Sequence, residues 1–185
     1  SSMVETLTNL QKISGPDADK YKGIPTGFRL LDTVLTGLGR GDLIILAARP
    51  GMGKTSFALN MLLHAGKFSG KTVVFFSLEM SREQLALRLI SSECFVDNKK
   101  LVTGKLTEED WEKVAVAADS LNRSRIFIDD DSSVSVADIS AKCRRMDNLG
   151  LVIIDYLQLM SQQGFKSGDR VNEISAITRQ IKILA

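Results

Sequence analysis

The sequence has little of several residue types, and each shortage excludes a class of protein. Two cysteines among 185 residues give neither a disulfide scaffold nor a paired-cysteine zinc site. No apolar run approaches the roughly 18 residues that a membrane-spanning helix needs, and the first residues do not resemble a signal peptide. Basic and acidic residues number 24 and 22, which leaves a net charge of +2 and no broad basic surface. We therefore expect a cytoplasmic globular protein with no membrane contact, in which any binding of nucleic acid depends on a few placed cations.

Short, nearly all-apolar runs alternate along the chain with helical patterns. These runs cover residues 43–47, 73–76, 126–128 and 151–154. Because they do not alternate polar with apolar side chains, they suit strands that are covered on both faces, as in a parallel sheet. The helical patterns between them open with a capping-box signature at Ser81, Thr107 and Ser135. This alternation predicts an α/β fold with a mostly parallel sheet flanked by helices.

A change of pattern near residue 24 divides the chain into two expected parts. Residues 1–23 contain a short helical pattern, a Gly-Pro break and a polar stretch, and are interpreted as a linker or lead-in segment. Residues 24–185 are interpreted as one ATPase domain that begins with a short helix near residues 28–38, with Leu30 turned inward. The last helical pattern runs to Ala185 without a stop signal. We therefore expect a domain that lacks its last strands.

One segment carries the sequence pattern of a phosphate-binding loop. It follows an apolar run, precedes a helical pattern and reads Ala48-Arg49-Pro50-Gly51-Met52-Gly53-Lys54-Thr55. The motif G-x-x-x-x-G-K-[ST] fits, with a small alanine at the first glycine position. Glycines let the backbone curl so that several N–H groups converge on one anion, and the following helix adds its positive end. We assign these residues and Ser56 to ATP binding, with Lys54 on the outer phosphates and Thr55 on Mg²⁺.

Two carboxylates are candidates to complete this site. Asp155 ends an apolar run, where an acid in a phosphate-loop enzyme supports the magnesium ion, although many strands end in an ordinary aspartate. Many ATPases place a glutamate directly after this aspartate, but here that position is Tyr156. Glu79 ends another run, and neighbouring parallel strands bring their carboxyl ends to the same edge. Glu79 is therefore our candidate base for the attacking water, and the alternative is a solvated loop acid.

Together these motifs resemble the C-terminal motor domain of DnaB-type replicative DNA helicases. The resemblance extends over residues 24–185. It includes the Ile-Pro-Thr-Gly-Phe segment at 24–28, the phosphate loop, Phe-Ser-Leu-Glu-Met-Ser at 76–81 and Thr-Gly-Lys-Leu-Thr at 103–107. It continues through Lys-Cys-Arg-Arg at 142–145 and Val-Ile-Ile-Asp-Tyr-Leu-Gln-Leu at 152–159. Several separate blocks in one order are more specific than a phosphate loop alone.

The resemblance implies a RecA-like fold and a ring of six subunits around single-stranded DNA, with ATP bound between subunits. It implies that Lys54 and Glu79 are catalytic, that Thr55 and Asp155 hold Mg²⁺, and that a primase and a helicase loader are partners. Two alternatives stay open. One is another RecA-like ATPase, and the other is a nucleotide-dependent DNA-binding or loader module.

A polar segment after the Asp155 run contains two candidate DNA-binding residues. In the family a loop at this place faces the central channel, so Lys166 and Arg170 are expected to meet DNA phosphates. A solvent loop with incidental charges is the alternative interpretation, and the sequence does not decide between the two.

Overall fold

The fold is built on a parallel sheet of three strands in the order β2-β1-β3. The computed structural model describes residues 2–16, 18, 22–157 and 170–185. Within these residues the strands are β1 (Thr72–Ser77), β2 (Ile126–Asp129) and β3 (Leu149–Asp155). Both neighbours of β1 run parallel to it. Three of the four apolar runs are therefore strands, and the predicted parallel sheet flanked by helices is confirmed.

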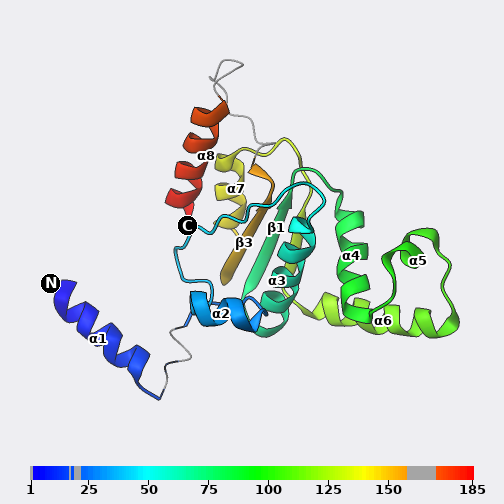
Figure 1. Ribbon diagram of the computed structural model, residues 1–185, viewed down its shortest axis with the longest axis horizontal. Helices are drawn as coiled ribbons and strands as arrows, with labels where there is room; N and C mark the ends of the chain where they lie inside the picture. The colour runs from blue at the N-terminus through cyan, green and yellow to red at the C-terminus, as the bar shows by residue number, and fades with distance from the viewer. Residues whose placement is uncertain (1, 17, 19–21, 158–169) are drawn as a thin grey trace.

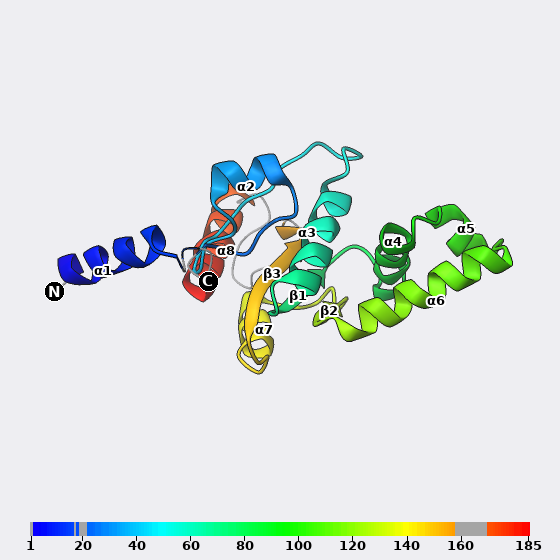
Figure 2. The ribbon, with the colours of Figure 1, turned by 90° about the horizontal axis from the view of Figure 1, so that it is seen from below.

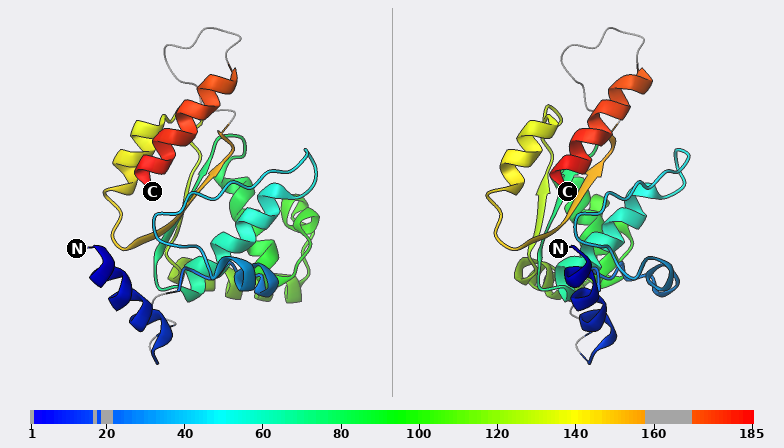
Figure 3. Two further views of the ribbon diagram at one scale, coloured as in Figure 1. Left: turned by 60° about the vertical axis from the view of Figure 1, so that its left-hand side comes forward. Right: turned by 90° about the vertical axis from the view of Figure 1, so that its left-hand side faces the viewer.

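The sheet is covered on both faces because β1 is apolar on both faces. All six residues of β1 are buried. Val74 and Phe76 pack with apolar side chains of the helices α7 and α8, and Figure 3 shows these two helices side by side. Val73 and Phe75 point the other way and pack with the helices α3 and α4. Each Phe of β1 is completely buried, so the apolar run that predicted the strand also supplies both halves of the core.

Eight helices accompany these strands in the described part of the chain (Figure 1). They are α1 (Ser2–Ser14), α2 (Arg29–Leu35), α3 (Lys54–Phe68), α4 (Arg82–Cys94), α5 (Asn98–Thr103), α6 (Glu108–Arg123), α7 (Val136–Cys143) and α8 (Arg170–Leu184). The capping boxes at Ser81, Thr107 and Ser135 are all formed, with Gln84, Asp110 and Asp138 as their partners three residues further on. None of the described helices is long and apolar enough to cross a membrane.

The helices α4, α5 and α6 extend away from the sheet on one side, and α1 lies at the opposite end of the molecule (Figure 2). The α4–α6 arm has a small core of its own around Cys94, Val96 and Ala117. Leu7 and Leu10 of α1 are more than half exposed, so α1 stands outside the core of the sheet. The interpretation of residues 1–23 as a linker or lead-in segment stays a prediction.

Two local expectations were wrong. Residues 43–47 form no strand, and Ile45 is 64% exposed. A strand needs a neighbour to satisfy its backbone groups, and no described segment pairs with this one. Leu30 of α2 is 83% exposed and does not face the core. Helical spacing alone placed it inward, but this seven-residue helix buries no residue at all.

Candidate nucleotide-binding site

The phosphate loop is an open turn that leads directly into α3. Gly51 has φ +78° and Gly53, the residue before the helix, has φ +84°. An added Cβ at either position would meet nothing within 4 Å, so space is not the constraint. The constraint is the left-handed backbone conformation, which costs a side-chain-bearing residue free energy. Both glycines of the motif are therefore required by the shape of the loop itself.

The start of α3 is arranged to receive an anion. No side chain caps this helix, because its N-cap residue is Gly53. The first N–H groups of the helix consequently have no side-chain acceptor and lie at the positive end of the helix dipole. Residues 48–53 are all exposed, and Met52 is 74% exposed. An uncapped helix start beside an exposed glycine loop is a suitable receptor for phosphate oxygens.

Asp155 joins this helix start to the sheet. It is the last residue of β3 and is only 7% exposed. One carboxylate oxygen accepts a hydrogen bond of 2.5 Å from the Thr55 hydroxyl group. The other lies 3.2 Å from the ammonium nitrogen of Lys54. The three residues that the sequence assigned to phosphate and magnesium therefore lie in mutual contact.

This arrangement fits a magnesium ion that is shared with a bound nucleotide. No cluster of three or more His, Cys, Asp or Glu side chains occurs in the part of the chain that the structure describes. Magnesium does not require one, because it is usually held by one or two protein oxygens together with substrate phosphates and water. The Thr55 hydroxyl group and the Asp155 carboxylate supply such a pair of oxygens.

Tyr156 is a second partner of Lys54. The Lys54 ammonium nitrogen is 4.2 Å from the centre of the Tyr156 ring, which is a cation–π distance. In the sequence this tyrosine stands where many ATPases have a glutamate, and it belongs to one of the blocks that carry the family resemblance. Its contact with Lys54 joins two segments far apart in the chain, and no sequence pattern indicated it.

Glu79 lies at the same edge of the sheet as Asp155. The last residue of β1, Ser77, is in register with Asp155, and the Leu78 N–H group donates to the Asp155 carbonyl oxygen at 2.8 Å. The Ser77 hydroxyl group bonds both the N–H and the carbonyl of Met80, which closes a tight turn around Glu79. Glu79 is exposed, and no hydrogen bond or ion pair engages its carboxylate within the described ranges. It is therefore accessible to a water molecule at this edge.

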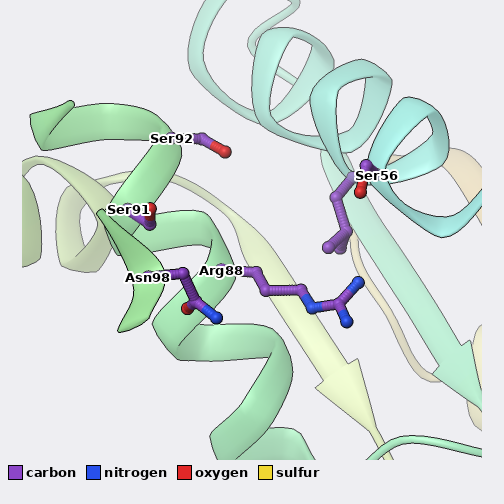
Figure 4. Close-up of a pocket in the computed structure, with 6 residues that line it drawn as sticks. Ser56, Arg88, Ser91, Ser92 and Asn98 are labelled. Carbon is purple, nitrogen blue, oxygen red and sulfur yellow. The ribbon is translucent and has the colours of Figure 1, made fainter. Parts of the chain in front are cut away.

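A separate surface cavity of about 340 Å³ lies between α3 and the α4–α5 corner (Figure 4). It is lined by Ser56, Leu59, Arg88, Ser91, Ser92 and Asn98. The Arg88 side chain extends from α4 toward Ser56 on α3. Arg88 belongs to no motif recognised in the sequence, whereas Ser56 was grouped with the phosphate loop. The structure shows that Ser56 lines this cavity, whereas Thr55 contacts Asp155.

The two candidate DNA-binding residues receive no structural description. Lys166 lies outside the described residues. Arg170 is the first residue of α8, but its side chain is not described either. Both assignments remain predictions from the sequence.

The sheet, the glycine loop and the Lys54–Thr55–Asp155 contact define a phosphate-loop nucleotide-binding domain. Residues 23–185 match the family described as "DnaB-like helicase C terminal domain". The chain belongs to this family.

Comparison with curated relatives agrees with this membership. The chain is 45% identical over 99% of its length to "Replicative DNA helicase DnaB" of Geobacillus stearothermophilus. It is 44% identical, also over 99% of its length, to "Replicative DNA helicase DnaC" of Bacillus subtilis (strain 168). In both cases the match covers 41% of the relative. The chain thus spans about two fifths of the length of these relatives.

Solved structures confirm the fold. One of them, described as an "ATPase Domain", superposes with a TM-score of 0.88 at 32% identity, over all of this chain and 66% of that one. A DnaB-like replicative helicase, described with its interactions with primase, superposes with a TM-score of 0.84 at 31% identity. That match covers 99% of this chain and 44% of the helicase. The RecA-like fold implied by the resemblance is therefore correct.

Proposed function

We propose that this chain is the ATP-hydrolysing motor of a replicative DNA helicase. The observation that carries the proposal is the contact of Lys54 and Thr55 with Asp155 beside an exposed glutamate. A binding module needs only the first part of this arrangement. The accessible Glu79 carboxylate at the same edge supplies the group that hydrolysis needs in addition. Membership of the helicase family supports DNA as the polymer on which the motor acts.

Each residue of the site has a distinct proposed task. The loop N–H groups and the start of α3 bind the phosphates, and Lys54 neutralises charge that develops on the transferred phosphoryl group. Thr55 and Asp155 would hold Mg²⁺, which would spread the negative charge of the phosphates. Glu79 orients the attacking water and accepts its proton. Its exposure in this chain is consistent with a site that a second subunit covers.

The assembly around this motor is proposed from the family and from the resemblance. The proposal includes a ring of six subunits on single-stranded DNA, with Lys166 and Arg170 near the DNA, and with primase and a loader as partners. One structural relative is described with its interactions with primase. Residues 1–23 would link the motor, residues 24–185, to a preceding domain. A cytoplasmic location is included because it suits an enzyme of DNA replication.

The test uses the full-length protein that contains this chain. We expect single-stranded DNA to stimulate ATP hydrolysis, and a forked duplex to be unwound only with ATP. Lys54→Ala should lower the turnover number by roughly 10²- to 10³-fold, as expected for loss of a group that stabilises transition-state charge. Lys113→Ala, which alters a surface ion pair on α6, is the matched control and should retain activity. Rings that hydrolyse ATP without unwinding would contradict the helicase assignment, and ATP binding without turnover would favour the loader alternative.

A further inference from the structure

Lys54 contacts two groups of different chemical character. Asp155 lies 3.2 Å from its ammonium nitrogen, and the ring of Tyr156 lies 4.2 Å away, centre to nitrogen. The Lys54 side chain is 29% exposed in this position. The tyrosine ring is half-buried, and its hydroxyl group makes no hydrogen bond within the residues that the structure describes. What Tyr156 offers to this site is therefore the face of its ring.

The two contacts are not equivalent for a lysine that must bind phosphate. Asp155 forms an ion pair with the ammonium group, competes with phosphate for its charge, and has a second proposed task at Mg²⁺. An aromatic face attracts a cation through the ring quadrupole without presenting a carboxylate. It leaves the three N–H donors of the ammonium group available to oxygen atoms. A glutamate at position 156 would instead add a second carboxylate beside Lys54.

From this geometry we infer that Tyr156 is a positioning residue that holds the Lys54 ammonium group over its ring for phosphate binding. The inference rests on the proposed ATPase function and adds a residue to it. Tyr156 acts through Lys54 and has no chemical step of its own. The ring face is the active feature, and the hydroxyl group is dispensable.

The first test detects the contact without nucleotide. In the 185-residue chain with ¹³C-labelled lysine, the ε-methylene protons of Lys54 should resonate upfield because they lie over an aromatic ring. The shift should persist in Tyr156→Phe and disappear in Tyr156→Leu. Lys67, whose ammonium nitrogen lies 5.6 Å from the centre of the Phe68 ring, is an internal reference that neither variant should move. Absence of the Lys54 shift in the parent chain, or its survival in Tyr156→Leu, would overturn the inference.

The second test measures ATP affinity by titration with a fluorescent ATP analogue in the presence of Mg²⁺. Tyr156→Phe should bind like the parent chain, and Tyr156→Leu should bind about 2- to 30-fold more weakly, the range of a cation–π contact. Phenylalanines carrying one to three fluorine atoms at position 156 keep the size of the ring and weaken its attraction for cations. Affinity should therefore fall stepwise with fluorine number, which a packing role would not cause.

A variant that lacks the Lys54 ammonium group separates this inference from the proposed function. In Lys54→Met, the change Tyr156→Leu should have no further effect on ATP affinity. An equal loss in both backgrounds, or an affinity independent of fluorine number, would refute the positioning role. Failure of the proposed function gives a different result, because it is a loss of ATP turnover or of unwinding in the full-length protein, whereas these comparisons measure ATP affinity alone.

Discussion

The helix α3, which carries Lys54 and Thr55, packs closely on the sheet at Gly66. This close packing gives a quantitative prediction. A Cβ atom added to Gly66 would lie well inside van der Waals contact of Ile126 Cγ1, 2.8 Å from Ile126 Cδ1 and 3.1 Å from Val73 Cγ2. Overpacking of this kind costs about 1–3 kcal/mol. Alanine in place of glycine within a helix returns about 1 kcal/mol. We therefore expect Gly66→Ala to lower the free energy of unfolding by about 1 kcal/mol.

A second variant tests whether the clash with Ile126 causes this loss of stability. Ile126→Ala removes both atoms that approach closest and leaves only the milder contact with Val73 Cγ2 at 3.1 Å, so in that background the helix propensity should dominate. Gly66→Ala should then raise the free energy of unfolding by up to about 1 kcal/mol, which reverses the sign of its effect. Urea unfolding of the parent chain, both single variants and the double variant measures all four free energies. The same loss in both backgrounds would refute the proposed clash and would place the cost of Gly66→Ala elsewhere.

Two further predictions concern charged groups. In Asp155→Asn the Mg²⁺ concentration needed for tight ATP binding should rise by about 10- to 100-fold, as it does when other groups that support a metal site are lost. ATP binding without Mg²⁺ should persist. An unchanged Mg²⁺ midpoint would contradict the role of Asp155 at the metal. The hydrogen bond from Lys100, and then that from the Thr107 N–H group, lower the pKa of Asp110 below its ordinary value. A lowered carboxyl pKa stabilises the folded state above the ordinary pKa of about 3.9 and loses that contribution as the pH falls through the folded value. Asp110→Asn should therefore unfold at lower urea than the parent chain at pH 7, and the two midpoints should converge below about pH 4. A gap of constant size would count against this linkage.

Features that depend on local sequence could be predicted, and the structure confirms them. The capping boxes at Ser81, Thr107 and Ser135 form within a single turn of chain. Residues 73–76 form a strand because their side chains are apolar on both faces, a property visible in the sequence.

Features that depend on distant partners could not be predicted. Residues 43–47 have the composition of a strand but find no partner among the described residues. At the start of α4, the Arg82 N–H group donates a hydrogen bond to the Asp130 carboxylate, which lies 48 positions further along the chain. The contact of Thr55 with Asp155 spans 100 positions, and the motif predicted it only because phosphate-loop proteins share it. The contact of the Tyr156 ring with Lys54 was not indicated by any motif and required the structure.

The measurement that tests the central claim most directly compares ATP binding with ATP turnover in Glu79→Gln of the full-length protein. Glutamine keeps the size of the side chain but accepts a proton poorly, so binding and chemistry should separate. We expect ATP affinity within about threefold of the parent, and DNA-stimulated turnover reduced by about 10²- to 10⁴-fold, the contribution of a general base. Unchanged turnover would show that Glu79 is an ordinary surface acid and that the hydrolytic assignment of this site is wrong.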